Sequence, residues 1–161
     1  MKTYYIFRHG ETRATLAGRG YGFQIRSAHI IEEGKPAMMR MGGFLKNIPT
    51  DHNVSSRYNR CKETAQIITE VTGKEFAFDN RVNEFFFETF GRLRFRLRKF
   101  IEEMESSDYE TILICTHGAC ISGITKLLTK GEYSPEEILD FPPPGILLKI
   151  KDGKIEKWDF N

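Results

Sequence analysis

Two short apolar runs, each followed by a His-Gly pair, place the strongest constraint on how this 161-residue chain can fold. Residues 3–7 lead into Arg8-His9-Gly10-Glu11, and residues 111–115 lead into Thr116-His117-Gly118. Both runs are short and rich in β-branched and aromatic residues, which is typical of buried strands. In open α/β sheets, ligands bind beyond the carboxyl ends of the strands. The two histidines are therefore predicted to share one site.

Strand-like and helix-like segments alternate along most of the chain. Further strands are predicted at residues 54–56 and 76–78, and helices at residues 35–46, 60–73, 90–104 and 119–128. Asp152-Gly153 lies between two apolar segments and is a strong hairpin signal. This alternation predicts an α/β fold: a three-layer sandwich with a mostly parallel sheet flanked by helices and an antiparallel edge strand or C-terminal hairpin. We expect one domain over residues 1–161.

The composition and net charge of the chain limit the kinds of partner that it is expected to bind. The formal net charge of +2 provides no global field that would attract nucleic acid or a membrane. No apolar stretch approaches the roughly 18 residues that span a bilayer. The three cysteines lack Cys-x-x-Cys spacing, which argues against zinc and fits a reducing compartment. We therefore expect a cytoplasmic protein that binds neither nucleic acid nor membrane.

Several segments leave two interpretations open. Residues 18–22 alternate glycine with larger residues and could form either a flexible active-site loop or an ordinary surface loop. Residues 85–87 are three phenylalanines that could enclose a carboxylate. Five basic residues crowd the helix predicted at residues 90–104, and a solvated face is favoured over a docking surface for an acidic partner. They are Arg92, Arg94, Arg96, Arg98 and Lys99.

The residues at the strand ends suggest phosphate chemistry. Arg8 and Arg60 provide planar guanidinium groups that bind phosphate oxygens in pairs. A neutral imidazole is a competent nucleophile toward phosphorus, and His9 is the candidate, oriented by a hydrogen bond from its ring to the adjacent turn. His117 would be protonated beside a dianion and stabilise the transferring group. Glu84 would act as the general acid, because burial and nearby negative charge raise the pKa of a carboxyl group.

Four motifs, in order, resemble those of the histidine phosphatase superfamily, the phosphoglycerate-mutase-like phosphatases. Arg8-His9-Gly10-Glu11-Thr12 resembles the Arg-His-Gly-Glu-Thr signature of that family. Residues 55–65 resemble its Ser-Ser-Pro-Leu-x-Arg-Ala-x-x-Thr-Ala stretch, which favours Arg60 over Arg57 as the pocket arginine. Residues 81–84 resemble the Leu-x-Glu segment of the proton donor, and residues 116–118 resemble the Ser-His-Gly of the second histidine.

The resemblance implies a short, single-domain phosphatase that needs neither metal nor cofactor. In it, His9 would be phosphorylated, while Glu84 would protonate the leaving group and then activate water. The substrate would be a phosphorylated small molecule or a phosphoprotein, as for the phosphohistidine phosphatases that act on signalling proteins. The sequence identifies neither the substrate nor an oligomeric state. The candidate phosphate- or substrate-binding residues are Arg8, Thr15, Arg19, Arg60, His117 and Gly118.

The chain also departs from the family pattern. Thr15 replaces a common asparagine, and residues 85–90 lack the glycine that usually follows the acid. One alternative is therefore a phosphate-binding module with weak or lost turnover. A phosphoglycerate-mutase-type phosphoryl transferase is disfavoured, because the segment between Glu84 and His117 is too short for the insertion of true mutases. A third alternative is an interaction protein that works through the arginine-rich helix.

Overall fold

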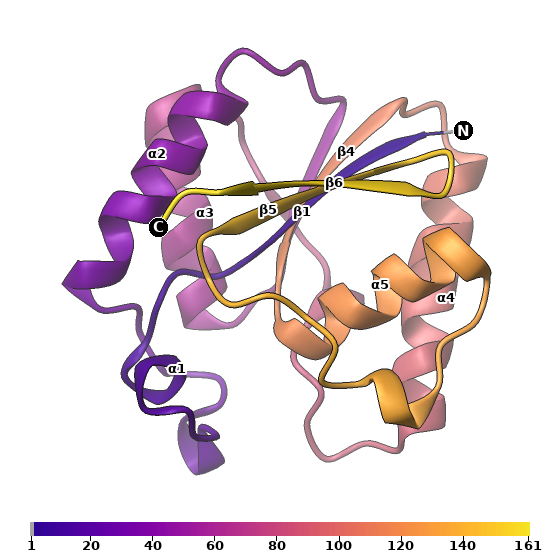
Figure 1. Cartoon of the computed structure of the whole chain (residues 1–161), viewed down its shortest axis with the longest axis horizontal. Coiled ribbons are helices and arrows are strands. Elements are labelled where there is room, and N and C mark those ends of the chain that lie inside the picture. The colour runs from indigo at the N-terminus through magenta and orange to yellow at the C-terminus, as the bar shows by residue number, and fades with distance from the viewer. Residues whose placement is uncertain (1) are drawn as a thin grey trace.

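The computed structural model describes residues 2–161, and Met1, the first residue of the predicted domain, lies outside the described residues. The described chain forms one six-stranded sheet in the order β3-β2-β4-β1-β5-β6, with helices on both faces (Figure 1). The strands are β1 (Thr3–Arg8), β2 (His52–Ser55), β3 (Ala77–Phe78), β4 (Thr111–Thr116), β5 (Ile146–Lys151) and β6 (Lys154–Asp159).

The pairing of the strands confirms the predicted sheet. β1 and β2 both pair in parallel with β4, and β3 pairs in parallel with β2. β5 runs antiparallel to β1, and β6 runs antiparallel to β5. The turn between them uses Asp152 and Gly153, both with positive φ, as a two-residue type I′ hairpin requires. The sheet is therefore mostly parallel with an antiparallel C-terminal edge.

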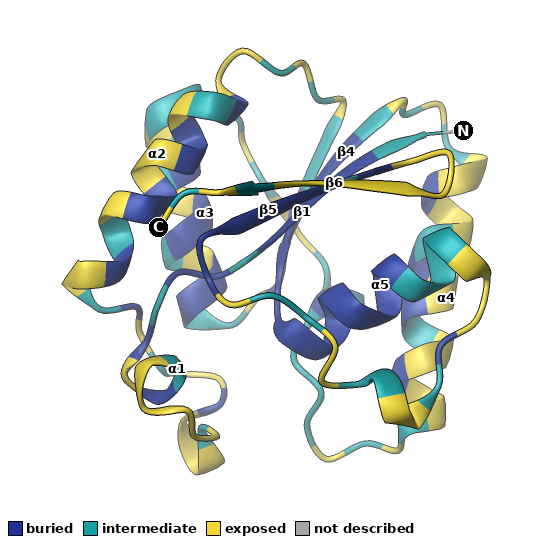
Figure 2. Ribbon diagram, viewed as in Figure 1, coloured by how far each residue is buried: buried dark blue, intermediate teal, exposed yellow. Residues whose placement is uncertain are grey.

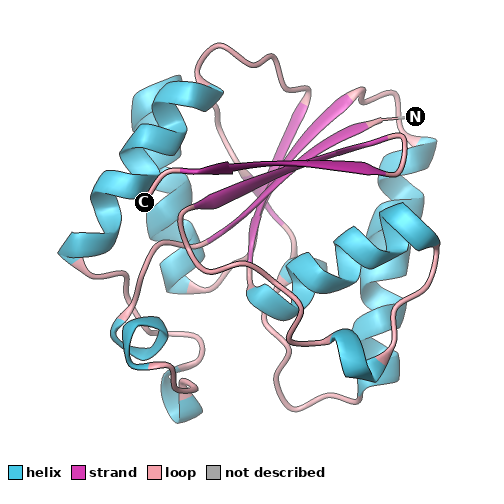
Figure 3. Ribbon diagram, viewed as in Figure 1, coloured by secondary structure: helices cyan, strands magenta, loops and turns pink. Residues whose placement is uncertain are grey.

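Helices cover the two faces of the sheet in pairs (Figure 3). α2 (Lys35–Leu45) and α3 (Asn59–Thr72) pack on one face, and α4 (Phe90–Ser106) and α5 (Gly118–Lys130) pack on the other. Successive strand residues point to opposite faces, so Ile6 joins the α4/α5 core and Phe7 joins the α2/α3 core. Figure 2 shows the result: β1, β4, β5 and most of α5 are buried, whereas β6 is exposed.

The helices within residues 2–161 all belong to this sandwich or its loops, and none is long and apolar enough to cross a bilayer. The predicted helices are confirmed to within about two residues at each end, as far as helix boundaries are defined. α3 ends at Gly73 in the left-handed conformation, with φ of 76°. That glycine terminates the helix because a side chain at positive φ would be strained.

Two segments differ from the sequence-based expectation. No helix is predicted between His9 and the loop at residues 18–22, but the structure has a short one there, α1 (Arg13–Ala17), which begins with a capping box between Thr12 and Thr15 and ends at Gly18. Ala14 is its one buried residue, so no apolar periodicity could reveal it. The other is residues 134–137, where Ser134 followed by Pro135 is typical of a helix start, but the structure has only one 3₁₀ turn, η4 (Pro135–Glu137).

The packing between α4 and α5 can be tested at Gly123. A Cβ atom there would lie 2.4 Å from Cδ1 of Leu97 and 2.7 Å from Cε2 of Tyr133, both of which are buried. We expect Gly123→Ala to lower the free energy of unfolding by about 1–3 kcal/mol through overpacking.

Gly43→Ala is the matched control, since Gly43 of α2 is exposed with no neighbour within 4 Å. There, alanine should stabilise the helix by up to about 1 kcal/mol. Urea denaturation of both variants measures the difference, and equal effects would contradict this account.

Candidate active site

The parallel pairing of β1 with β4 brings the two histidines together. Arg8 is opposite Thr116 in the register, so His9 and His117 leave the same edge of the sheet side by side. The backbone N–H of His9 donates to the carbonyl of Thr116 at 3.1 Å, which extends the ladder by one bond. The two imidazole centroids are 5.4 Å apart, and both side chains are fully buried. The predicted two-histidine site is thus present in the fold.

His9 is held as a neutral imidazole with its lone pair on Nε2. Its Nδ1–H donates to the carbonyl of Gly10 at 2.8 Å, which is the hydrogen bond to the turn that the sequence predicts. Its Nε2 accepts from Nε of Arg60 at 3.2 Å. Burial lowers the pKa of His9 well below its ordinary value, and Arg60 and Arg8 lower it further. The ring therefore has the protonation state and orientation of a nucleophile.

Arg60 crosses the centre of the site from the first turn of α3. Its side chain is fully buried, and its guanidinium group stacks 3.9 Å from the ring centroid of Tyr21. Nη1 donates to the carbonyl of Ile25, and Nη2 lies 3.5 Å from Oε2 of Glu84. Arg57, by contrast, is exposed. The pocket arginine is therefore Arg60, as the resemblance implies.

A short hydrogen-bond chain fixes the tautomer of His117. Oδ1 of Asn83 accepts from the backbone N–H of Arg57 and from the hydroxyl of Ser56, both at 2.9 Å. Oγ of Ser56 also accepts from the backbone N–H of Tyr58, so it is left as an acceptor for Nε2–H of His117 at 2.7 Å. Nδ1 of His117 is then the nitrogen that carries the lone pair toward the site.

Burial and the charged groups of the protein itself keep His117 in its neutral form. Burial lowers the pKa of His117 well below its ordinary value, and Arg60, His9 and Arg8 lower it further. The sequence predicts that His117 is protonated beside a dianion. The negative charge of such a ligand would raise the pKa of His117 and so oppose the effects of burial and of the neighbouring cations. Protonation of His117 is therefore tied to the arrival of an anion.

Glu84 faces both the arginine and the second histidine. Its Oε2 lies 3.5 Å from Nη2 of Arg60 and 3.5 Å from Nδ1 of His117, and its Oε1 accepts from the backbone N–H of Phe85. Burial raises the pKa of Glu84, and the attraction of Arg60 only partly offsets this effect. The expected enclosure by three phenylalanines is wrong in part: Phe85 borders the carboxyl group, whereas Phe87 is 92% exposed.

Two buried polar atoms of this site have no hydrogen-bond partner within residues 2–161. They are Nε of Arg8 and Nδ1 of His117. Leaving a buried polar group unpaired is costly, and a ligand with several oxygen atoms would satisfy both. Burial lowers the pKa of Arg8, whose guanidinium carbon lies 5.0 Å from the ring centroid of Phe141. The arrangement of two arginines and two histidines therefore suits a phosphoryl group.

Beside this group is a cavity of about 350 Å³. Its lining comprises Arg8, Glu84, Phe85, Gly118, Ala119, Ile138, Leu139 and Phe141. Gly118 is the first residue of α5, and a Cβ atom there would lie 2.5 Å from the ring of Phe141. Glycine is therefore needed at this position so that the aromatic ring can approach the strand end closely.

The structure does not bring Thr15 or Arg19 into contact with the histidines. The hydroxyl of Thr15 accepts from the backbone N–H of Thr12 at 2.7 Å and donates to its carbonyl, so it is part of the α1 cap. Arg19 is exposed, and its side chain makes no hydrogen bond or ion pair within the described chain. A part for either residue in phosphate binding stays a prediction.

Arg96 is the functional residue that the sequence analysis misassigned. It was expected on a solvated face, and its neighbours Arg92, Arg94, Arg98 and Lys99 are indeed exposed. Arg96 instead forms a bidentate pair with the carboxylate of Glu88 and donates to the carbonyls of Arg81 and Glu84. It thereby fastens the segment that carries the candidate acid.

Ser56, Asn83 and Tyr21 were not singled out from the sequence either. Ser56 lies within the motif at residues 55–65, which is the only signal that could have indicated it. Asn83 and Tyr21 act across long sequence separations, since Asn83 contacts Ser56 and Tyr21 contacts Arg60. Contacts of this kind leave no local pattern in the sequence.

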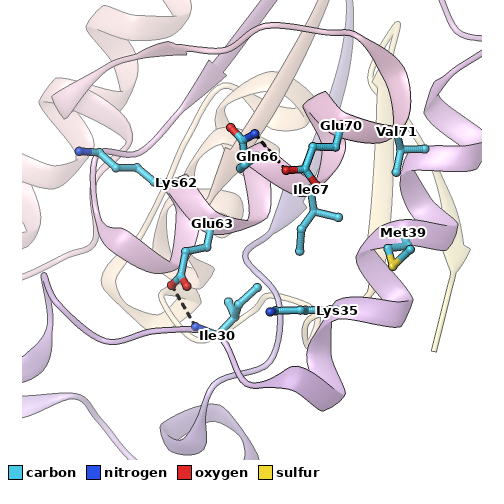
Figure 4. A pocket seen from close by; sticks show the side chains of 9 residues that line it. All are labelled: Ile30, Lys35, Met39, Lys62, Glu63, Gln66, Ile67, Glu70 and Val71. Carbon is cyan, nitrogen blue, oxygen red and sulfur yellow. Dashed lines mark hydrogen bonds between the residues drawn. The ribbon is translucent and has the colours of Figure 1, made fainter.

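A larger cavity, of about 510 Å³, lies between α2 and α3 (Figure 4). Several of its polar groups already have partners: the carboxylate of Glu63 accepts from the backbone N–H of Ile30, Gln66 donates to Glu70, and Lys35 pairs with Glu32. None of the catalytic candidates lines this cavity. Two of those candidates, Arg8 and Glu84, line the smaller cavity instead.

Two histidines, two arginines and a largely buried carboxyl group thus lie together at the carboxyl edge of an α/β sheet. Residues 4–95 match the family described as "Histidine phosphatase superfamily (branch 1)". The chain belongs to the histidine phosphatase superfamily.

Curated relatives match over part of their length. The chain is 31% identical over 80 residues to "Probable phosphoglycerate mutase GpmB" of Salmonella paratyphi C, an alignment that covers 50% of this chain and 36% of the relative. The same identity and coverage hold for the protein of that name from Salmonella choleraesuis. The match thus spans about a third of the length of these relatives.

Solved structures confirm the fold over nearly the whole chain. The alpha-ribazole phosphatase from Shigella flexneri has a TM-score of 0.80 at 18% identity, covering 98% of this chain and 95% of that chain. A mycobacterial glucosyl-3-phosphoglycerate phosphatase has a TM-score of 0.74 at 16% identity, covering 99% and 97%. The protein histidine phosphatase SixA has a TM-score of 0.65 at 13% identity, covering 98% and 97%. At these identities the likeness establishes the fold.

The lowered pKa values of His9 and His117 predict how stability depends on pH. In the unfolded chain a histidine titrates near 6.5, so below about pH 6.5 the unfolded state binds protons that the folded state does not. The free energy of unfolding should therefore fall as the pH drops from 8 to 5, by up to about 1.4 kcal/mol per pH unit for each histidine. His9→Asn should make this dependence shallower, whereas His29→Gln, at an exposed site, should leave it unchanged. Urea denaturation across this range measures it, and identical slopes for wild type and His9→Asn would contradict the assignment.

Proposed function

We propose that this protein hydrolyses a phosphomonoester or a phosphoprotein, without a metal ion, through a phosphohistidine intermediate on His9. The observation that supports the proposal best is the state of His9: a buried, neutral imidazole whose Nε2 lone pair faces Arg60 beside His117. Membership of the histidine phosphatase superfamily supports the same chemistry. The catalytic residues would be His9, Glu84, His117, Arg8 and Arg60, all within one catalytic domain over residues 1–161.

In the first step, Nε2 of His9 attacks phosphorus, an N–P bond forms, and the P–O bond to the leaving group breaks. Glu84, whose pKa burial raises, would donate a proton to the leaving oxygen. In the second step, water attacks the phosphohistidine, Glu84 accepts a proton from that water, and the N–P bond breaks. Inorganic phosphate leaves, and His9 and Glu84 return to their starting states.

The remaining groups would stabilise the transferring phosphoryl group. Arg8 and Arg60 would hold its oxygens through charge-assisted hydrogen bonds. The negative charge of the ligand would raise the pKa of His117, so that Nδ1 becomes protonated and donates to a phosphoryl oxygen. Ser56 and Asn83 would keep Nε2 of His117 engaged during this change. These three cations supply the charge that a metal ion supplies in other phosphatases.

We also propose a cellular compartment and a class of substrate for this activity. All three cysteines are buried free thiols, which supports a reducing compartment such as the cytoplasm. The similar proteins are described by their names as acting on alpha-ribazole phosphate, glucosyl-3-phosphoglycerate or protein histidine. A phosphorylated small molecule or phosphoprotein is therefore the proposed partner.

A phosphate-binding module with weak turnover is the second candidate. The position of Thr15 in the α1 cap, away from the site, favours it, because the family often has an asparagine there. Such a module would bind vanadate tightly and release no product. A phosphoglycerate-mutase-type transferase remains the less favoured alternative, because the segment between Glu84 and His117 is too short for the insertion of true mutases.

Loss of the nucleophile gives the central test of the proposal. We expect His9→Ala to reduce phosphate release from p-nitrophenyl phosphate, assayed in EDTA, by on the order of 10⁴-fold, as removal of a covalent nucleophile generally does. His29→Ala is the control, since His29 is exposed and lies outside the site. Wild type quenched with detergent at alkaline pH should also retain ³²P from a labelled substrate in a form that acid releases, as a phosphohistidine would. Activity of His9→Ala within tenfold of wild type would refute the mechanism.

The acid role of Glu84 can be separated from its other effects by the choice of leaving group. We expect Glu84→Gln to reduce kcat for an alkyl phosphate at least 100-fold, because the alkoxide needs a proton. The loss on p-nitrophenyl phosphate should be much smaller, since p-nitrophenolate leaves without one. Steady-state kinetics on both substrates gives the comparison, and equal losses would remove Glu84 from this role.

A further inference from the structure

The cavity beside the catalytic groups is charged at one end only. Of its lining residues, Arg8 and Glu84 are ionisable. The other six are uncharged and apolar: Phe85, Gly118, Ala119, Ile138, Leu139 and Phe141. Its volume of about 350 Å³ is in the lower range of cavities that hold small molecules. The cavity is thus sized for an organic group and offers it an apolar surface.

The position of Glu84 determines which part of a substrate this cavity would receive. If Glu84 protonates the leaving oxygen, the organic group attached to that oxygen lies on the Glu84 side of the phosphorus. The apolar wall on that side comes from residues 138–141, which follow η4 after α5 (Figure 1). Phe141 is fixed in this wall, because its ring contacts Arg8 on one side and packs against Gly118 on the other.

Within residues 2–161, Arg8 is the one cationic residue that lines this cavity. Lys126, which lies near the wall, forms an ion pair with Asp140. Arg8 and Arg60 are the proposed ligands of the phosphoryl group itself. A carboxylate or a second phosphate placed against Phe85, Leu139 and Phe141 would lose its hydration without gaining a cation, which is costly.

From this arrangement we infer the substrate class: a small phosphomonoester whose alcohol carries an apolar alkyl or aryl group and no second anionic group. The apolar wall of residues 138–141 is its specificity determinant. This inference rests on the proposed phosphatase activity and goes beyond it, because the phosphoryl chemistry alone would accept any monoester. It also distinguishes this chain from an enzyme that acts on phosphoglycerate, which is both phosphorylated and carboxylated.

The test compares ethyl, butyl and hexyl phosphate with 3-phosphoglycerate, all assayed for phosphate release in EDTA. The alkyl series has nearly constant leaving-group chemistry, so differences report burial of the chain. We expect kcat/KM to rise about threefold per methylene, as transfer of CH₂ groups from water predicts. 3-Phosphoglycerate should be at least tenfold poorer than butyl phosphate.

A charge placed in the wall provides an independent test. Leu139 is 79% exposed, so Leu139→Lys should fold normally. We expect it to lower kcat/KM for hexyl phosphate about tenfold and to raise it for 3-phosphoglycerate about tenfold. Ile155→Lys is the matched control: Ile155 is 49% exposed on β6, near the hairpin at the opposite end of the sheet. That variant should leave both values unchanged.

The outcomes separate this inference from the proposed function. Turnover of p-nitrophenyl phosphate with kcat/KM independent of chain length, or with 3-phosphoglycerate preferred, would overturn the inference and leave the phosphatase function standing. A phosphopeptide hydrolysed with higher kcat/KM than every alkyl phosphate would also overturn it. If the folded wild type turned over none of these substrates, including p-nitrophenyl phosphate, both the function and the inference would be wrong.

Discussion

The parallel pairing of β1 with β4 is the constraint on which the rest of the structure depends. Arg8 is opposite Thr116, so the next residue of each strand is a histidine, and the two rings meet at one edge of the sheet. Both strands are central and buried on both faces. A slip of one residue would move every core side chain to the wrong face, so hydrophobic packing fixes this register. The geometry of the site is therefore set by the core beneath it.

Burial also sets the protonation states that the proposed chemistry needs. The same loss of water lowers the pKa values of His9 and His117 and raises that of Glu84, because desolvation disfavours the charged form of each group. One physical cause thus favours the neutral form of the two imidazoles and of the carboxyl group. Arg60 lies between His9 and Glu84, and its contacts with them orient both side chains.

Two sets of contacts surround the catalytic groups, one on the phosphate side and one on the leaving-group side. On the phosphate side, Ser56 and Asn83 fix the tautomer of His117, while Arg96 with Glu88 fastens the segment of Glu84. These contacts are polar and join elements far apart in sequence. On the leaving-group side, the wall is apolar and comes from the segment after α5. In the proposed mechanism, this division would allow the phosphoryl chemistry to stay constant while the wall selects the alcohol.

The sequence by itself determined the strands, most helices, the C-terminal hairpin and the positions of His9, Arg60 and His117, because periodicity, turn residues and short motifs act over a few residues. It did not reveal α1, whose five residues bury only Ala14. Only the tertiary structure decided that Arg96 is buried in an ion pair rather than solvated, that Thr15 caps a helix, and that Phe87 points to solvent. The physical reason is that burial and long-range pairing depend on which surfaces the folded chain brings together, and identical local sequence patterns are compatible with either outcome.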